Sequence, residues 1–120
     1  MLLYYRGVYV MPKKNIYFKF EMLILSILKD QDCYGYQITS TIKELSDGLI
    51  VIKEGTMYPT LYKMIENGYI SSRDVTVNRK VRVYYHIEDT GRLYLQQLEK
   101  EYFLWEEKIR KIIKRGDNHE

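Results

Sequence analysis

The chain has 120 residues, of which 46% are apolar and 29% charged, and its net charge is +3. This length fits one compact unit at the usual ~100–200 residues per domain, and the composition excludes a disordered or low-complexity chain. A membrane-spanning helix is excluded because no apolar run approaches the ~20 residues that it needs, and a single cysteine, Cys33, excludes an internal disulfide and fits a reducing, cytoplasmic setting.

The first residues of the chain do not read as a targeting signal. Residues 1–10 have no basic start and no small-residue cleavage site. A second methionine, Met11, follows them and precedes a polar stretch. We therefore expect residues 1–15 to be an extension from an upstream start or a short arm, with the domain beginning near Met11.

Three helices are predicted next. Apolar side chains recur at steps of three and four residues along 16–30, from Tyr36 to Asp47, and from about Lys53 to Asn67. The β-branched run 49–52, just before the third helix, predicts a short strand. Pro59 fits the third helix if it lies in the first turn, where its missing N–H has no partner within the helix.

Two glycines frame the third helix, and a hairpin follows it. We expect Gly55 to allow an unusual backbone conformation at the start of the helix and Gly68 to end the helix with a positive φ. Beyond Gly68 the apolar period changes to two, over residues 69–77 and 81–87. This pattern predicts a two-stranded hairpin with its tip near Asn78.

The final segment, 89–114, predicts one long helix with acidic residues at its start. Its apolar residues follow alternating steps of three and four, which is the spacing of a coiled-coil seam. They are Leu95, Leu98, Tyr102, Trp105, Ile109 and Ile112. A chain of this size has little left to cover such a seam, so we expect this helix to hold a homodimer.

The order of these elements is that of a winged helix-turn-helix domain, in which the third helix enters the major groove of DNA and the hairpin forms the wing. The expected fold class is α+β and mostly α. We expect residues 16–88 to be the DNA-binding domain, 89–115 a C-terminal dimerisation helix and 116–120 a polar tail. The distribution of charge agrees with this assignment. The segment 73–82, which contains the hairpin tip, has a net charge of +3 that can neutralise phosphates, from Arg73, Arg79, Lys80 and Arg82 against Asp74.

Five short motifs carry a resemblance to a known family. They are Tyr34-Gly35-Tyr36-Gln37-Ile38, Glu54-Gly55-Thr56-Met57-Tyr58-Pro59-Thr60-Leu61-Tyr62, Asn67-Gly68-Tyr69-Ile70, Tyr84-Tyr85-His86-Ile87 and Thr90-Gly91-Arg92. In residue type, order and spacing they resemble the PadR family of transcriptional regulators. The resemblance covers the chain from about Phe20 onward, and the segment from Gly55 to Tyr62 is its most specific part.

The resemblance implies a homodimeric winged-helix repressor that binds palindromic operators and dimerises through its last helix. The single short C-terminal helix is similar to the small PadR subgroup, some members of which control drug-efflux genes and bind flat aromatic compounds between protomers. The chain departs from the family pattern in two places. Glu88 stands before the last helix, where the family often has threonine, and the wing tip has no glycine.

The candidate DNA contacts share a hydroxyl or a cation that reaches phosphates or base edges. They lie at the start of the second helix, along the third helix and on the wing: Tyr36, Thr56, Tyr58, Tyr62, Lys63, Arg79, Lys80 and Arg82. The alternatives are that the tyrosines pack into the domain and that the wing charges form an ordinary solvated face.

Trp105 has two interpretations. Its indole on the dimer seam is either a plain interface anchor or a wall on which a small planar aromatic effector stacks. An enzyme is not indicated, because the sequence has no glycine loop that would bind phosphate and no metal-ligand spacing. Cys33, His86 and His119 are also far from one another in the sequence. We expect no catalytic residue, no metal and no cofactor.

The sequence thus predicts a DNA-binding transcriptional regulator that represses from a palindromic operator in double-stranded DNA as a homodimer. A small aromatic ligand is the candidate effector that releases the repressor from its operator. The alternative is a winged helix that serves protein–protein contact without specific DNA binding, and the basic wing argues against this alternative.

Overall fold

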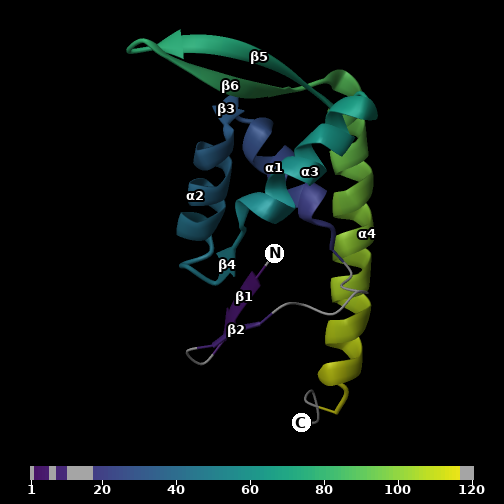
Figure 1. Ribbon diagram of the computed structural model, residues 1–120. Coiled ribbons are helices and arrows are strands. Elements are labelled where there is room, and N and C mark those ends of the chain that lie inside the picture. Colours follow the sequence, from purple (N-terminus) through teal and green to yellow (C-terminus); the bar gives the residue numbers. More distant parts are fainter. Residues whose placement is uncertain (1, 6–7, 11–17, 117–120) are drawn as a thin grey trace.

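The computed structural model describes residues 2–5, 8–10 and 18–116 of the chain. Helices α1 (Phe20–Leu28), α2 (Gly35–Leu45) and α3 (Glu54–Glu66) form the body, and the long helix α4 (Asp89–Ile113) runs along one side of it (Figure 1). The hairpin of β5 (Ile70–Val77) and β6 (Lys80–Ile87) crosses the top in this view. The short strands are β1 (Leu2–Tyr5), β2 (Val8–Val10), β3 (Cys33–Tyr34) and β4 (Ile50–Val51). This is the expected mostly helical α+β winged-helix fold.

The core is built from the helix faces that the periodicity predicted. Each fully buried Leu, Ile or Met stabilises the fold by ~1.5–3 kcal/mol. The core side chains therefore hold α3 in a fixed orientation on the other helices. These side chains come from all four helices and from the neighbouring strands, and each is at most 6% exposed: Ile24, Leu25, Leu28, Cys33, Ile38, Ile42, Ile52, Met57, Leu61, Met64, Ile70, Tyr85, Ile87, Leu95 and Leu98.

α3 begins where the sequence predicted, but Pro59 lies further into the helix than expected. The N–H groups of Thr56 and Met57 both donate to the Lys53 carbonyl at 3.0 Å, which makes Lys53 the N-cap. Pro59 therefore lies in the second turn, and the expectation that it lies in the first turn is wrong. At this position Pro59 has no N–H to donate to the carbonyl of Gly55, four residues earlier.

The two glycines that frame α3 behave differently. Gly68 follows the C-cap with φ of 77° and ends the helix, as predicted. Gly55 is not among the described glycines with positive φ and lies within the regular helix, so the unusual backbone conformation expected there is absent. A Cβ at residue 55 would meet nothing within 4 Å, because this side of α3 is open to solvent.

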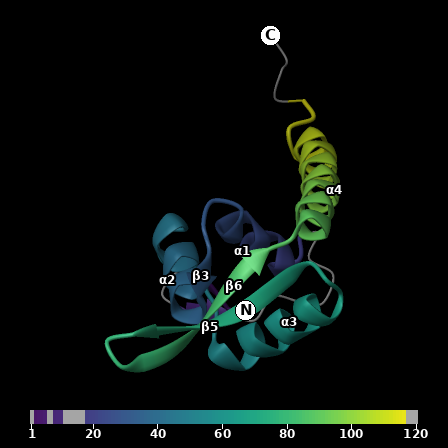
Figure 2. The ribbon, with the colours of Figure 1, turned by 90° about the horizontal axis from the view of Figure 1, so that it is seen from above.

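β5 and β6 form the predicted hairpin. Asn78 and Arg79 join the strands with φ of 51° and 66°, and two consecutive positive φ values give a type I′ turn that matches the twist of the strands. The far half has no core beneath it. Val81 and Val83 are 65% and 41% exposed, although their alternation with polar residues predicted a buried face. The reason is that the hairpin reaches past the helices there (Figure 2).

β6 is the central strand of a three-stranded sheet ordered β3–β6–β5. Cys33 pairs with Tyr85, and Tyr34 pairs with Tyr84. β3 was not predicted, because a two-residue strand is too short to show a period in the sequence. The pairing ties the base of the wing to the start of α2.

The first residues form a second sheet, ordered β2–β1–β4, in which Leu2 lies opposite Val51 and Leu3 opposite Ile50. The expected extension or arm over residues 1–15 thus contains two strands. Several stretches covered by the predictions lie outside the described residues: 1, 6–7 and 11–15 of the arm, 16–17 at the predicted start of the first helix, and 117–120 of the polar tail.

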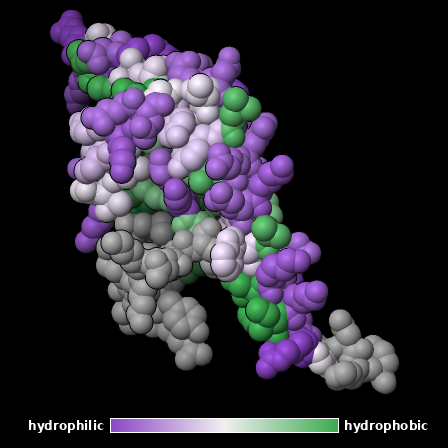
Figure 3. Space-filling model, turned by 90° about the vertical axis from the view of Figure 1, so that its right-hand side faces the viewer, coloured by the Kyte–Doolittle hydropathy of each residue, from purple (hydrophilic) through white to green (hydrophobic). Residues whose placement is uncertain are grey.

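α4 starts on the body and ends beyond it (Figure 1). Leu95 and Leu98 pack into the protomer's own core, where α4 lies against α1. Further along, the helix leaves the body, and apolar side chains lie along this projecting part (Figure 3). Despite its length α4 is not apolar enough to cross a membrane, and the same holds for the other described helices.

Candidate nucleic-acid interface

α3 presents two flanks on either side of its solvent-facing surface. At about 100° per residue, Tyr58 and Tyr62 lie one turn apart on the flank toward the wing. Thr56 and Lys63 lie two turns apart on the other flank. Tyr62 is 59% exposed and Lys63 is exposed, whereas Tyr58 and Thr56 are half-buried. The α3 candidates therefore do not form a single stripe, and Tyr62 does not pack into the domain.

A groove of about 330 Å³ lies between α3, the start of α2 and the wing strand β6. Tyr36 at its rim is 71% exposed, so its ring does not pack on α3. The rings of Tyr58 and Tyr62 are 6.4 Å apart. The structure brings four of the predicted residues together here, and the full lining is Tyr34, Gly35, Tyr36, Tyr58, Tyr62, Val81, Arg82, Val83 and Tyr85.

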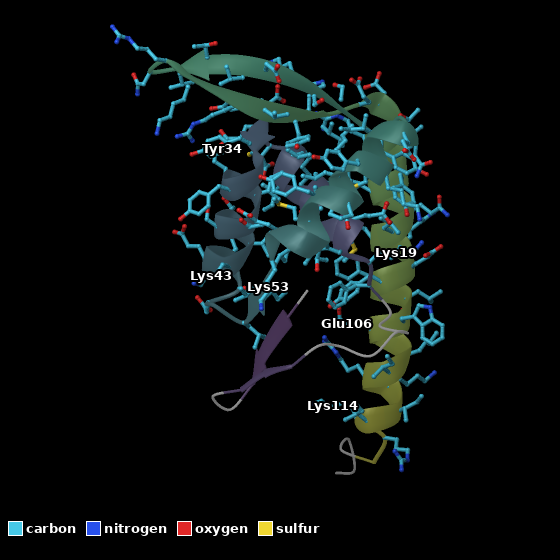
Figure 4. The ribbon with its side chains drawn as sticks, viewed as in Figure 1. Lys19, Tyr34, Lys43, Lys53, Glu106 and Lys114 are labelled. Atoms are coloured by element: carbon cyan, nitrogen blue, oxygen red, sulfur yellow. The ribbon has the colours of Figure 1, made fainter. Side chains whose placement is uncertain are left out.

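Two tyrosines of this groove were not predicted. Tyr85 is buried, and burial raises the pKa of its phenol. Tyr34 lies directly beneath the wing, at the top of α2 (Figure 4). Only the pairing of β3 with β6 brings Tyr34 to the wing, and no periodicity in the sequence signals that pairing. Two tyrosine rings therefore line the groove beside the predicted residues.

The basic residues of the wing fall into two groups. Arg79 and Lys80 are exposed at the tip, and Arg82 lies over the ring of Tyr34 with its guanidinium carbon 4.3 Å from the ring centroid. Arg82 therefore borders the groove, and Arg79 and Lys80 face solvent. Arg73, by contrast, is paired with Asp32 at the base of the wing.

Asp32 fastens both wing strands at that base. One carboxylate oxygen of Asp32 pairs with Arg73 of β5, and the other lies 2.7 Å from Nδ1 of His86 on β6. The hydrogen bond with His86 lowers the pKa of Asp32; burial opposes this shift and the bond from Arg73 adds to it. The charge of Arg73 is thus engaged within the protomer.

The seam predicted on α4 divides into two parts. Leu95 and Leu98 are only 4% and 5% exposed within one protomer, so their heptad spacing is explained by the core and needs no partner. Tyr102 and Ile109 are half-buried, while Trp105 is 58% and Ile112 62% exposed. Further exposed apolar side chains outside the seam are Leu93, Phe103, Leu104 and Ile113.

The described residues do not bring metal-ligating side chains together. No three His, Cys, Asp or Glu side chains come close enough there to hold a metal ion. Burial raises the pKa of the Cys33 thiol, whose sulfur lies 3.5 Å from the carbonyl of Gln31. What the surface offers instead is hydroxyls and cations on one face, a chemistry that suits a polyanion.

The sequence matches a known family over much of its length. Residues 24–97, from α1 into α4, match the profile of the transcriptional regulator PadR-like family. A protein of Lysinibacillus sphaericus is 33% identical over 95 residues, which cover 78% of this chain and 83% of that protein.

Solved structures give the same likeness. A transcriptional regulator from Clostridium thermocellum has a TM-score of 0.69 and 36% identity, over 81% of this chain and 91% of that one. A PadR family transcription regulator from hypervirulent Clostridium difficile has a TM-score of 0.69 and 29% identity, over 78% and 96%. Bacillus subtilis PadR in complex with operator DNA has a TM-score of 0.58 and 28% identity, over 64% of this chain and 43% of that one.

Proposed function

Because the chain belongs to the transcriptional regulator PadR-like family, we propose that it represses transcription by binding a palindromic operator as a homodimer. α3 enters the major groove and the wing lies along the phosphate backbone. The observation that supports this function is the tyrosine-lined groove between α3 and the wing, with Arg82 on its wing side. Bacillus subtilis PadR, which is similar to this chain, was solved on operator DNA.

The roles of the candidate residues follow from where they lie. Arg79 and Lys80, at the exposed tip, neutralise phosphates whatever the DNA sequence. Tyr36 and Tyr62 project hydroxyls toward the backbone at the rim of the groove. Lys63, with Thr56 two turns away on the same flank, faces base edges and contributes to sequence preference.

We propose that the dimer forms through the part of α4 that projects beyond the body. Burying Trp105 and its exposed apolar neighbours there stabilises the dimer by ~1.5–3 kcal/mol for each side chain. Charge favours an antiparallel arrangement of the two helices. Between Glu99 and Glu107, four glutamates stand against one lysine, Lys100, and the basic stretch Lys108, Arg110, Lys111, Lys114 and Arg115 follows. Antiparallel packing therefore sets opposite charges side by side.

We also propose Trp105 as the site of a planar aromatic effector. An indole that is 58% exposed on a dimerisation helix offers a face for stacking. A ligand there lowers operator affinity only if it binds better to a dimer whose two α3 helices are wrongly spaced. Because Trp105 is the sole tryptophan, its fluorescence reports on this site directly.

The test combines oligomeric state with DNA binding. Light scattering should give twice the chain mass of 14.5 kDa, and anisotropy with a labelled random duplex should give an affinity that falls steeply as salt rises. If the protein acts only in protein–protein contact, it will show no salt-dependent binding to any duplex. A monodisperse monomer at micromolar concentration would refute the dimer.

A further inference from the structure

We propose that Tyr34 is a positioning residue that holds the wing arginine Arg82 in place for its phosphate contact. This inference rests on the proposed DNA-binding function. The guanidinium carbon of Arg82 lies 4.3 Å from the centroid of the Tyr34 ring, well within the ~6 Å range of a cation–π contact. Tyr34 belongs to β3 and Arg82 to β6, so the contact joins the start of α2 to the wing.

The strand register explains how this contact arises. Tyr34 pairs with Tyr84 across β3 and β6, and Arg82 lies two residues from Tyr84, hence on the same face of β6. The rings of Tyr84 and Tyr34 meet edge to face, at a centroid distance of 5.5 Å and an angle of 69°. Arg73, opposite Tyr84 on β5, lies 5.7 Å from the Tyr84 centroid. The four side chains form a continuous row of contacts, Arg73–Tyr84–Tyr34–Arg82, across the wing.

This row of contacts matters because the outer wing has little else to hold it. Val81 and Val83, on either side of Arg82, are 65% and 41% exposed and line the groove between β6 and the helices. Arg79 and Lys80 extend into solvent at the tip. Arg82 is the wing cation that contacts a ring fixed to the body. Its side chain is therefore ordered before DNA arrives, and less conformational freedom is lost on binding.

The same geometry places Arg82 at the edge of the tyrosine-lined groove, which Tyr34 and Arg82 both line. The N–H groups of a guanidinium lie in its own plane. A guanidinium whose face contacts an aromatic ring can therefore still donate hydrogen bonds to a phosphate. Removal of the Tyr34 ring should thus weaken DNA binding about threefold to tenfold. This factor corresponds to the entropic cost of ordering one long side chain on binding.

The test is a double-mutant cycle on DNA affinity. The variants are Tyr34→Leu, Tyr34→Phe, Arg82→Gln and Arg79→Gln, with the double variants Tyr34→Leu/Arg82→Gln and Tyr34→Leu/Arg79→Gln, all measured by anisotropy on one duplex at one salt concentration. Tyr34→Leu should weaken binding about threefold to tenfold, and Tyr34→Phe, which keeps the ring, should restore wild-type affinity. Thermal unfolding of each variant shows whether it is folded.

The coupling decides between positioning and a general effect on the fold. In the Arg82→Gln background, Tyr34→Leu should have no further effect, whereas in the matched Arg79→Gln background its full effect should remain, because Arg79 does not contact Tyr34. Equal effects in both backgrounds would overturn the proposal, as would unchanged or tighter binding by Tyr34→Leu alone.

A measurement without DNA separates this proposal from the proposed function. In the free protein, the Arg82 side-chain protons should show an upfield ring-current shift in the NMR spectrum that Tyr34→Leu abolishes. If the wild type binds no DNA but shows this shift, the proposed function fails and the Tyr34–Arg82 contact stands. If the wild type binds DNA and the shift is absent, the positioning role fails alone.

Discussion

Replacing Gly91 by alanine tests how α4 is joined to the body. A Cβ at residue 91 would lie 2.1 Å from the carbonyl oxygen of Tyr69 and 3.0 Å from Cγ1 of Ile87. The Tyr69 carbonyl also accepts the N–H of Glu88 at 2.9 Å, so it cannot turn away without breaking that bond. The start of α4 must therefore move away from the start of β5.

The magnitude follows from two opposing effects. Overpacking a buried site costs ~1–3 kcal/mol, and a clash with backbone belongs at the upper end of that range. Alanine has the better helix propensity, by ~1 kcal/mol, which offsets part of the cost. We expect Gly91→Ala to lower the free energy of unfolding by ~2 kcal/mol. The matched control is Gly55→Ala in exposed α3, where a Cβ meets nothing within 4 Å, and there we expect a gain of ~0.5–1 kcal/mol.

Urea unfolding followed by circular dichroism, at one protein concentration, measures both variants. The expected result is a lower midpoint for Gly91→Ala and a slightly higher midpoint for Gly55→Ala, with the slope unchanged. If Gly91→Ala is as stable as Gly55→Ala, the close approach of α4 to the Tyr69 carbonyl is not a feature of the folded protein.

Three further predictions concern the wing, the α1–α4 contact and the dimer. Replacing Arg79, Lys80 and Arg82 together by glutamine should flatten the log–log salt dependence of DNA binding by ~0.9 for each phosphate that the wing no longer neutralises; an unchanged slope would exclude the wing from the interface. Burial, with the Glu21 carboxylate 3.3 Å away, raises the pKa of Tyr94 to about 12. Wild-type stability should then be full below pH ~10 and fall as pH rises toward 12, and Tyr94→Phe should lose less over that window in thermal unfolding; equal decreases in the two proteins would contradict this. Trp105→Ala should raise the dimer dissociation constant ~30-fold or more in sedimentation experiments; no change would remove Trp105 from the interface.

The sequence predicted the features that come from local periodicity. The buried positions of α1, α2 and α3 repeat at helical spacing, and the wing strands alternate, so both were found without a structure. The fold class and the family followed from the order of these elements and from the motifs around Gly55 and Gly68. The Asn78–Arg79 turn also lies where the break between the two alternating runs predicted the hairpin tip.

The sequence could not predict contacts that depend on how distant segments meet. β3 has two residues and no period, so the approach of Tyr34 to Arg82 was hidden. Leu95 and Leu98 fit a heptad seam as well as a core, and only the packing of α4 on α1 distinguishes the two. Val81 and Val83 alternate like core residues although they are 65% and 41% exposed, because alternation does not show where a strand leaves the body.

The most direct test of the proposed function is selection of bound duplexes from a randomised library at physiological salt, followed by footprinting of the enriched sequence. A two-fold dimer that reads DNA with α3 should enrich an inverted repeat whose half-sites lie ~10 bp apart, and one dimer should protect both. Enrichment of no sequence, or of a single unrepeated half-site protected by one chain, would contradict the account.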